Sequence, residues 1–154
     1  MDIVFVVDES ESIGSTNFDL MKSFLSSLVG RLDIDRGNTR VGLITFSTNV
    51  GDGFNLSDYR TVASMQSAIS SLSYRQGGTN TAGALAYVRT TMLTSAAGDR
   101  RDFPDVVVVL TDGQSDNTNR TLVSIMHCML SISFSSLQVV STIDTTTTSQ
   151  LKMT

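Results

Sequence analysis

The chain has 154 residues, of which 40% are hydrophobic and 17% are charged, and its formal net charge is −4. This length and composition are typical of one globular domain with a substantial hydrophobic core. The acidic balance and the lack of a basic run argue against a nucleic-acid partner. The apolar runs are far shorter than the roughly 20 residues that span a bilayer, so we expect no membrane insertion.

No signal-like segment precedes the strand-like run that begins at Asp2, so we expect either a cytosolic chain or, preferably, a piece of a longer protein. Cys128 is the only cysteine, which excludes an internal disulfide.

Strand-like and helix-like segments alternate, which predicts an α/β fold: an open, mostly parallel, Rossmann-like sheet with helices on both faces. Residues 2–7 form a continuous apolar run, as expected of a strand covered on both sides. After a break at Gly14, Thr16 and Asp19 resemble a capping box for an amphipathic helix. The predicted inner face of that helix consists of Phe18, Met21, Leu25, Leu28, Val29 and Leu32.

The next two predicted strands are residues 41–46 and 51–56. Their connection is too short for a parallel crossover, so we expect a hairpin that adds one antiparallel edge strand. Ser57 and Asp58 are predicted to cap a second helix. The inner face of this helix is predicted to be Val62, Met65, Ile69 and Leu72.

A third helix is predicted over residues 81–93, with Ala82, Leu85, Ala86 and Met92 inward. A valine-rich interior strand follows at residues 105–111. A helix over about 119–131 and a strand over about 137–143 complete the expected elements. Residues 1–144 then form a single domain, and residues 145–154, which have no periodicity, are expected to be a disordered tail.

Oxygen-bearing side chains follow two of the apolar strands. Asp8, Ser10 and Ser12 come directly after the first strand, and Asp112 follows the strand at 105–111. In an open α/β sheet, ligands bind beyond the carboxyl ends of the strands. Thr79, which follows a Gly-Gly pair, is expected to reach the same edge. If the two strands are neighbours, these five residues share one crevice.

Three hydroxyls and two carboxylates supply only hard oxygen ligands, which suits Mg²⁺, with Mn²⁺ or Ca²⁺ as alternatives, and disfavours zinc and copper. Taken singly, Asp8 or Thr79 could cap a helix, and Asp112-Gly113 could be an ordinary turn. Taken together, two aspartates at one sheet edge would repel each other unless a cation lay between them. The sequence therefore predicts a metal site.

These residues resemble the von Willebrand factor type A domain, also seen as the inserted domain of integrins, and its metal-ion-dependent adhesion site (MIDAS). The family pattern Asp-x-Ser-x-Ser, a threonine in a Gly-Thr-Asn-Thr-like loop and an aspartate in Thr-Asp-Gly falls here on Asp8, Ser10, Ser12, Thr79 and Asp112. The resemblance covers residues 2–122, and its style is similar to copies in collagen-VI-like and matrilin-like chains.

The resemblance implies a non-enzymatic, cation-dependent module for cell adhesion or extracellular matrix binding. In the family, the two serines and the threonine contact the metal, and the aspartates act mostly through water. The open coordination position takes a Glu or Asp carboxylate of a partner protein, and collagen or another matrix protein is the implied partner. The implied location is extracellular, as a secreted, longer protein.

The sequence departs from the family pattern in two places. Glu9 and Glu11 flank the serines, and strand-like alternation predicts that both side chains point into solvent; the alternative is that they make the rim of the site acidic. After residue 122 the chain does not resemble the family, and a closing strand and helix are expected to be missing.

Two other functions are compatible with parts of the pattern. An intracellular type A domain could support a large assembly. A phosphatase of the haloacid dehalogenase type also places an aspartate after its first strand, but it needs a second carboxylate two residues later as general acid. Ser10 occupies that position, so we expect no enzyme activity.

Overall fold

The computed structural model describes residues 1–112, residue 116 and residues 134–141, the last segment by its backbone. Five strands form one sheet in the order β3-β2-β1-β4-β5. They are β1 (Asp2–Asp8), β2 (Arg40–Phe46), β3 (Val50–Phe54), β4 (Asp105–Thr111) and β5 (Phe134–Ser141). All neighbouring pairs are parallel except β2 and β3, so the predicted sheet with an antiparallel edge strand is confirmed.

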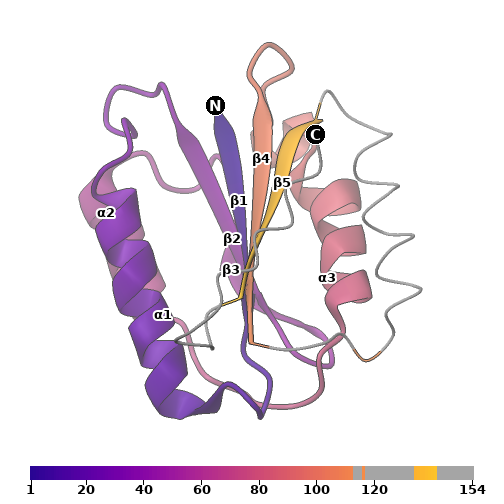
Figure 1. Cartoon of the computed structure of the whole chain (residues 1–154). Coiled ribbons are helices and arrows are strands. Elements are labelled where there is room, and N and C mark those ends of the chain that lie inside the picture. The colour runs from indigo at the N-terminus through magenta and orange to yellow at the C-terminus, as the bar shows by residue number, and fades with distance from the viewer. Residues whose placement is uncertain (113–115, 117–133, 142–154) are drawn as a thin grey trace.

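Helices cover both faces of the sheet (Figure 1). On one side lie α1 (Gly14–Val29) and α2 (Val62–Ser70), and on the other lies α3 (Thr81–Tyr87), which continues as a π-helical turn, Val88–Met92. A short 3₁₀ turn, Ser95–Ala97, follows before β4. Among the described residues, no helix combines the length and the apolar character needed to cross a membrane.

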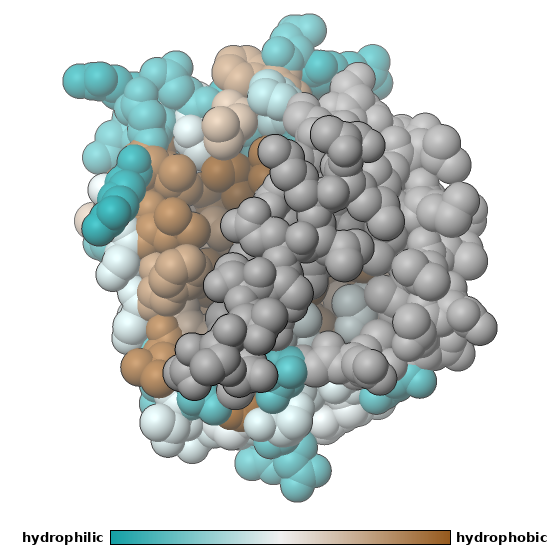
Figure 2. Space-filling model, viewed as in Figure 1, coloured by the Kyte–Doolittle hydropathy of each residue, from teal (hydrophilic) through white to brown (hydrophobic). Residues whose placement is uncertain are grey.

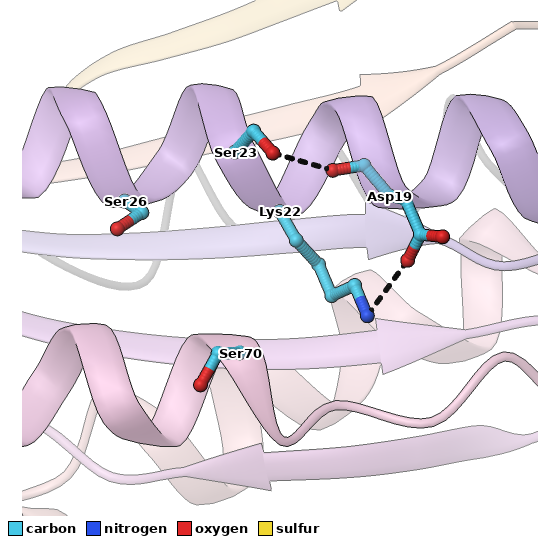
Figure 3. A pocket seen from close by; sticks show the side chains of 5 residues that line it. All are labelled: Asp19, Lys22, Ser23, Ser26 and Ser70. Carbon is cyan, nitrogen blue, oxygen red and sulfur yellow. Dashed lines mark hydrogen bonds and ion pairs between the residues drawn. The ribbon is translucent and has the colours of Figure 1, made fainter.

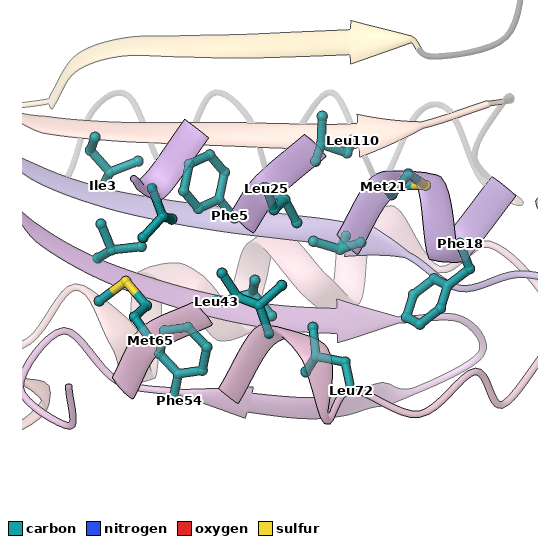
Figure 4. Packing of buried hydrophobic residues seen from close by; sticks show 14 of the residues in the cluster. Ile3, Phe5, Phe18, Met21, Leu25, Leu43, Phe54, Met65, Leu72 and Leu110 are labelled. Carbon is teal, nitrogen blue, oxygen red and sulfur yellow. The ribbon is translucent and has the colours of Figure 1, made fainter. Parts of the chain in front are cut away.

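The alternation of side chains along β1 divides the hydrophobic core into two layers. Ile3, Phe5 and Val7 pack against α1 and α2, whereas Val4 and Val6 face α3. Figure 4 shows the first layer, with Phe18, Met21 and Leu25 of α1 lying over the face of the strands. A strand buried on both faces has an unbroken run of apolar residues. The predicted bounds of β1 and β4 therefore agree with the observed ones to within one residue.

Two predicted helix caps are wrong. Helix α1 begins at Gly14, before the predicted cap at Thr16, and Ile13 stands at its N-cap without a side-chain hydrogen bond. Helix α2 begins only at Val62, where the Thr61 hydroxyl accepts from the Ser64 amide. Asp58 instead accepts from the Asn55 amide. Several hydroxyl and carboxyl groups stand near each start, so the local pattern does not decide whether any of them caps the helix.

The predicted helical faces are largely confirmed, with Phe18, Met21, Leu25 and Val29 buried on α1 and Met65 and Ile69 on α2. Strand β5 begins three residues before the predicted position. The predicted helix at 119–131 and the tail at 145–154 lie outside the described residues. So does the question of a missing closing strand and helix, which stays an expectation.

Candidate metal centre

The carboxyl ends of β1 and β4 lie side by side at the lower edge of the sheet in Figure 1. The register pairs Val7 with Leu110, so Asp8 and Thr111 follow at the same level. Both side chains project toward the α3 face, since they continue the alternation of Val4, Val6, Val107 and Val109. Strand register therefore brings together residues that are more than one hundred positions apart in the chain.

Asp8 is fully buried, and each of its carboxylate oxygens accepts a hydrogen bond. The Ser10 amide donates to Oδ1 at 2.8 Å, and the Thr111 hydroxyl donates to Oδ2 at 2.6 Å. The first bond closes an Asx turn, in which an aspartate side chain accepts from the backbone two residues ahead. Asp8 thus fixes the course of the loop that carries both serines.

Three further site residues form a chain of close oxygen atoms. Ser10 Oγ lies 3.1 Å from Ser12 Oγ, and Ser12 Oγ donates to Asp112 Oδ1 at 3.1 Å. Ser10 is buried, whereas Ser12 is exposed and Asp112 is half-buried. The group is therefore anchored in the protein on the Asp8 side and open to solvent on the Ser12 side.

Thr79 lies in a second loop that is fastened to the first. The Glu11 amide donates to the Gly77 carbonyl at 3.0 Å, and the Thr79 amide donates to the Asp116 carboxylate at 2.8 Å. The Asp116 amide in turn donates to the Thr79 carbonyl at 3.0 Å. The cap of α3 is the neighbouring Asn80, whose side chain accepts from the Gly83 amide, so Thr79 is not used as the helix cap.

Sequence reasoning missed several residues that hold these loops. Asp116 fixes Thr79, and the Tyr74 hydroxyl accepts from the Gly14 amide at 3.1 Å while donating to the Ser10 carbonyl at 3.0 Å. A tyrosine far along the chain gives no local signal of this role. The Thr-Asp-Gly motif contains Thr111 but does not reveal that its hydroxyl donates to Asp8.

The prediction that Glu9 points into solvent is wrong, although Glu11 is exposed as expected. Glu9 is 1% exposed, and its side chain lies against the backbone of Gly51, where an added Cβ would overlap Oε1. Its Oε2 accepts from the Arg75 amide at 3.3 Å. Burial raises the pKa of the Glu9 carboxyl, and Thr45 and Arg75 only partly oppose this shift. Gly51 of β3 covers the Glu9 side chain. The alternation of side chains along the loop cannot show that a distant strand lies over one of them.

A separate pocket lies between α1 and α2 (Figure 3) and is lined by Asp19, Lys22, Ser23, Ser26 and Ser70. The Lys22 ammonium pairs with Asp19 at 2.9 Å. None of the predicted site residues lines this pocket. The oxygen cluster at the strand ends is consequently the stronger candidate for function.

A family model named "von Willebrand factor type A domain" matches residues 2–151, which extends past the segment that carries the resemblance by motif. The chain is 40% identical over 118 residues to the collagen alpha-4(VI) chain of Mus musculus, covering 75% of this chain and 5% of that one. It is 35% identical over 116 residues to matrilin-1 of Homo sapiens, covering 75% and 23%. The chain thus spans a small part of these relatives.

Among solved structures, proximal thread matrix protein 1 from the mussel byssus is similar, with a TM-score of 0.79 and 25% identity over 90% of this chain and 36% of that one. The printed description of that structure gives a zinc-occupied MIDAS motif. In that protein, therefore, the motif accepts zinc, although hard oxygen ligands alone favour other ions.

Proposed function

Because the chain belongs to the von Willebrand factor type A domain family, we propose that Asp8, Ser10, Ser12, Thr79 and Asp112 hold a divalent metal ion through which the domain binds a partner protein. The relatives with which it aligns are collagen VI and matrilin chains, which are matrix proteins and not enzymes. This proposal places the chain in the extracellular matrix, as one module of a longer, secreted protein.

The spacing of the serine oxygens is the observation that carries the proposal. Neighbouring ligands in an octahedral Mg²⁺ site, each about 2.1 Å from the ion, lie about 3.0 Å apart. Ser10 Oγ and Ser12 Oγ, two of the proposed direct ligands, are 3.1 Å apart. This separation is compatible with both serine hydroxyls binding one small, hard cation.

The hydrogen bonds of Asp8 support an orienting role for this residue, and the family resemblance suggests the roles of the other four. Both oxygens of Asp8 already accept strong donors, so Asp8 orients the loop and contributes negative charge from behind the hydroxyls. Ser10, Ser12 and Thr79 would contact the ion, and Asp112 would act mainly through water. With neutral hydroxyls as direct ligands, the ion keeps most of its positive charge for an incoming anion.

The ion would act as a Lewis acid toward a Glu or Asp carboxylate of the partner. The exposure of Ser12 leaves this side of the cluster accessible from solvent. We propose collagen or another matrix protein as the partner class, and Mg²⁺ as the physiological ion, with Mn²⁺, Ca²⁺ and zinc as the ions to compare. The Ser10 hydroxyl lies beside Ser12 and cannot replace the general acid of a phosphatase near neutral pH.

The metal assignment is tested by thermal unfolding with and without Mg²⁺. At a concentration 100 times the dissociation constant, binding to the folded state adds about 2.7 kcal/mol, or about 5 to 10 °C for a domain of this size. We expect Asp112→Ala to lose this rise. Asp19→Ala, which removes an exposed carboxylate on α1, should keep it. An Asp112→Ala domain that is stabilised as much as the parent would contradict the assignment.

Partner binding is tested separately, with immobilised collagen VI and collagen I in Mg²⁺ or EDTA. Binding that needs the ion and is lost in Ser12→Ala supports the carboxylate-bridging role. Binding that persists unchanged in EDTA would show that the surface, and not the ion, recognises the partner.

A further inference from the structure

A second group of acidic side chains lies at the amino ends of β1 and β4, at the end of the sheet opposite the candidate metal centre. Asp2 and Asp105 begin the adjacent parallel strands β1 and β4 and are register partners. Both side chains lie on the α3 face, since the alternation places Val4 and Val107 there. Asp99, in the loop before β4, completes the group. Oxygen atoms of Asp2, Asp99 and Asp105 all lie within 4.8 Å of one another.

Of the three carboxylates, only that of Asp2 is paired with a positively charged side chain of the described residues, Arg100. The Arg100 guanidinium donates to Asp2 Oδ1, with Nε at 2.9 Å, and the Arg100 amide donates to Oδ2 at 2.9 Å. The remaining guanidinium donors reach backbone carbonyls, among them Gly37 at 2.7 Å. The ring of Phe103 lies 3.6 Å from the guanidinium carbon. Arg100 is thus held in place with its donors directed at Asp2 and the backbone.

Asp105 and Asp99 are left with unsatisfied oxygens. Asp105 is 3% exposed, and in the described part of the chain neither its Oδ1 nor Asp99 Oδ1 has a hydrogen-bond partner. Burying an ionised carboxylate without a hydrogen-bond partner or a counter-charge is strongly unfavourable. The three carboxylates, two of them buried and that of Asp99 half-buried, carry with one guanidinium a formal charge of −2, which the nearby α-ammonium of Met1 only partly offsets. A divalent cation would cancel that charge and supply the missing partner.

We infer that Asp2, Asp99 and Asp105 form a second cation site, selective for Ca²⁺, at the amino-terminal edge of the sheet. Ca²⁺ accepts six to eight oxygen ligands in variable geometry, and these can come largely from the protein. Mg²⁺ retains several waters in a strict octahedron, which suits a buried cluster less well. The inference does not depend on the proposed metal site at the other edge.

A shared proton is the competing occupant. Burial, together with the nearby charge of Asp99, raises the pKa of Asp105 to about 7. A proton between Asp99 and Asp105 would also satisfy both unpaired oxygens. The two occupants are distinguished by adding Ca²⁺ at pH 8, where a proton is held weakly and a Ca²⁺ site is available.

The test uses an Asp112→Ala background, in which the site at the other edge is disabled. We expect Ca²⁺ to raise the melting temperature of the EDTA-treated Asp112→Ala protein by about 5 to 10 °C at 100 times the dissociation constant. Calorimetric titration should show one bound Ca²⁺. Adding Asp105→Asn, which keeps the shape of the side chain, should abolish both signals. Adding Asp102→Asn, which neutralises an exposed acid of the same loop, should leave both unchanged.

Two results would overturn the inference: no Ca²⁺ response in the Asp112→Ala protein, which would assign the cluster to a proton, or an undiminished response after Asp105→Asn. Circular dichroism checks that each variant is folded, and Asp99→Asn replaces Asp105→Asn if that variant does not fold. A parent chain that ignores Mg²⁺ while Asp112→Ala responds to Ca²⁺ would refute the proposed function and support this inference.

Discussion

Thr111 shows at the scale of one residue how the site depends on a buried donor. Its hydroxyl donates to Asp8 Oδ2 at 2.6 Å, across the boundary between β4 and β1. Asp8 is fully buried, so water cannot replace this donor. A buried acceptor left without its hydrogen bond costs about 1 to 3 kcal/mol, and more when it is charged. Thr111 therefore stabilises both the fold and the orientation of the serine loop.

We expect Thr111→Val to lower the free energy of unfolding by about 2 to 3 kcal/mol in EDTA and to weaken Mg²⁺ binding. Thr111→Ser retains the hydroxyl and loses one methyl group, so it should cost about 1 kcal/mol and keep the Mg²⁺ response. Urea unfolding measures the first effect and titration with Mg²⁺ the second. Equal losses in the two variants would show that packing, and not the hydrogen bond, is what Thr111 supplies.

At the scale of elements, the loops at the two edges of the sheet position the charged groups. The loop between α3 and β4 turns at Gly98, whose φ of +97° lies in the left-handed region. The backbone of Ser57 lies directly beside it, since an added Cβ would be 2.8 Å from the Ser57 nitrogen. This turn directs Asp99 and Arg100 toward the start of β1.

Gly98 and Gly37 form a matched pair for testing this packing. Gly37 has a similar φ of +74°, but nothing lies within 4 Å of an added Cβ. Gly37→Ala should cost about 1 kcal/mol, the backbone strain alone. Gly98→Ala adds an overlap with backbone and should cost at least about 1 kcal/mol more. Urea unfolding compares the two variants. If Gly98→Ala lowers the free energy of unfolding no more than Gly37→Ala does, the loop moves aside without a measurable penalty.

At the scale of the whole molecule, strand β1 joins the two candidate cation sites. Asp8 stands at its carboxyl end and Asp2 at its amino end. Six residue steps of about 3.3 Å separate them by about 20 Å. In the view of Figure 2, hydrophilic side chains gather toward the two ends of the sheet, with an apolar area between them. The hydrophobic layers of the core separate the two polar edges.

This separation predicts that the two edges act independently. The effects of Asp105→Asn and Asp112→Ala on the free energy of unfolding should add within about 0.5 kcal/mol in the double variant, since the sites share no side chain. Urea unfolding of the parent, both single variants and the double variant in EDTA measures the coupling. A coupling above about 1 kcal/mol would indicate that β1 transmits strain between the edges.

Within the described part of the chain, the sequence by itself determined the order of elements and the placement of oxygen-bearing side chains at the carboxyl ends of β1 and β4. Unbroken apolar runs mark strands buried on both faces, and the carboxyl ends of parallel strands always share an edge. Asp8 and Asp112 could therefore be paired across the chain before their contacts were known. The motif residues stand directly after those strands, so an error of one or two residues in a strand end would not have hidden them.

Only the tertiary structure decided the helix caps, the burial of Glu9 and the grouping of Asp2 with Asp99 and Asp105. Each depends on a segment distant in sequence: Gly51 on β3 covers Glu9, and the Gly98 turn brings Asp99 to β1. Local periodicity reports which face of an element is apolar. It carries no information about which distant segment packs over a polar residue. That packing determines whether a carboxylate is solvated by water, protonated or bound to a cation.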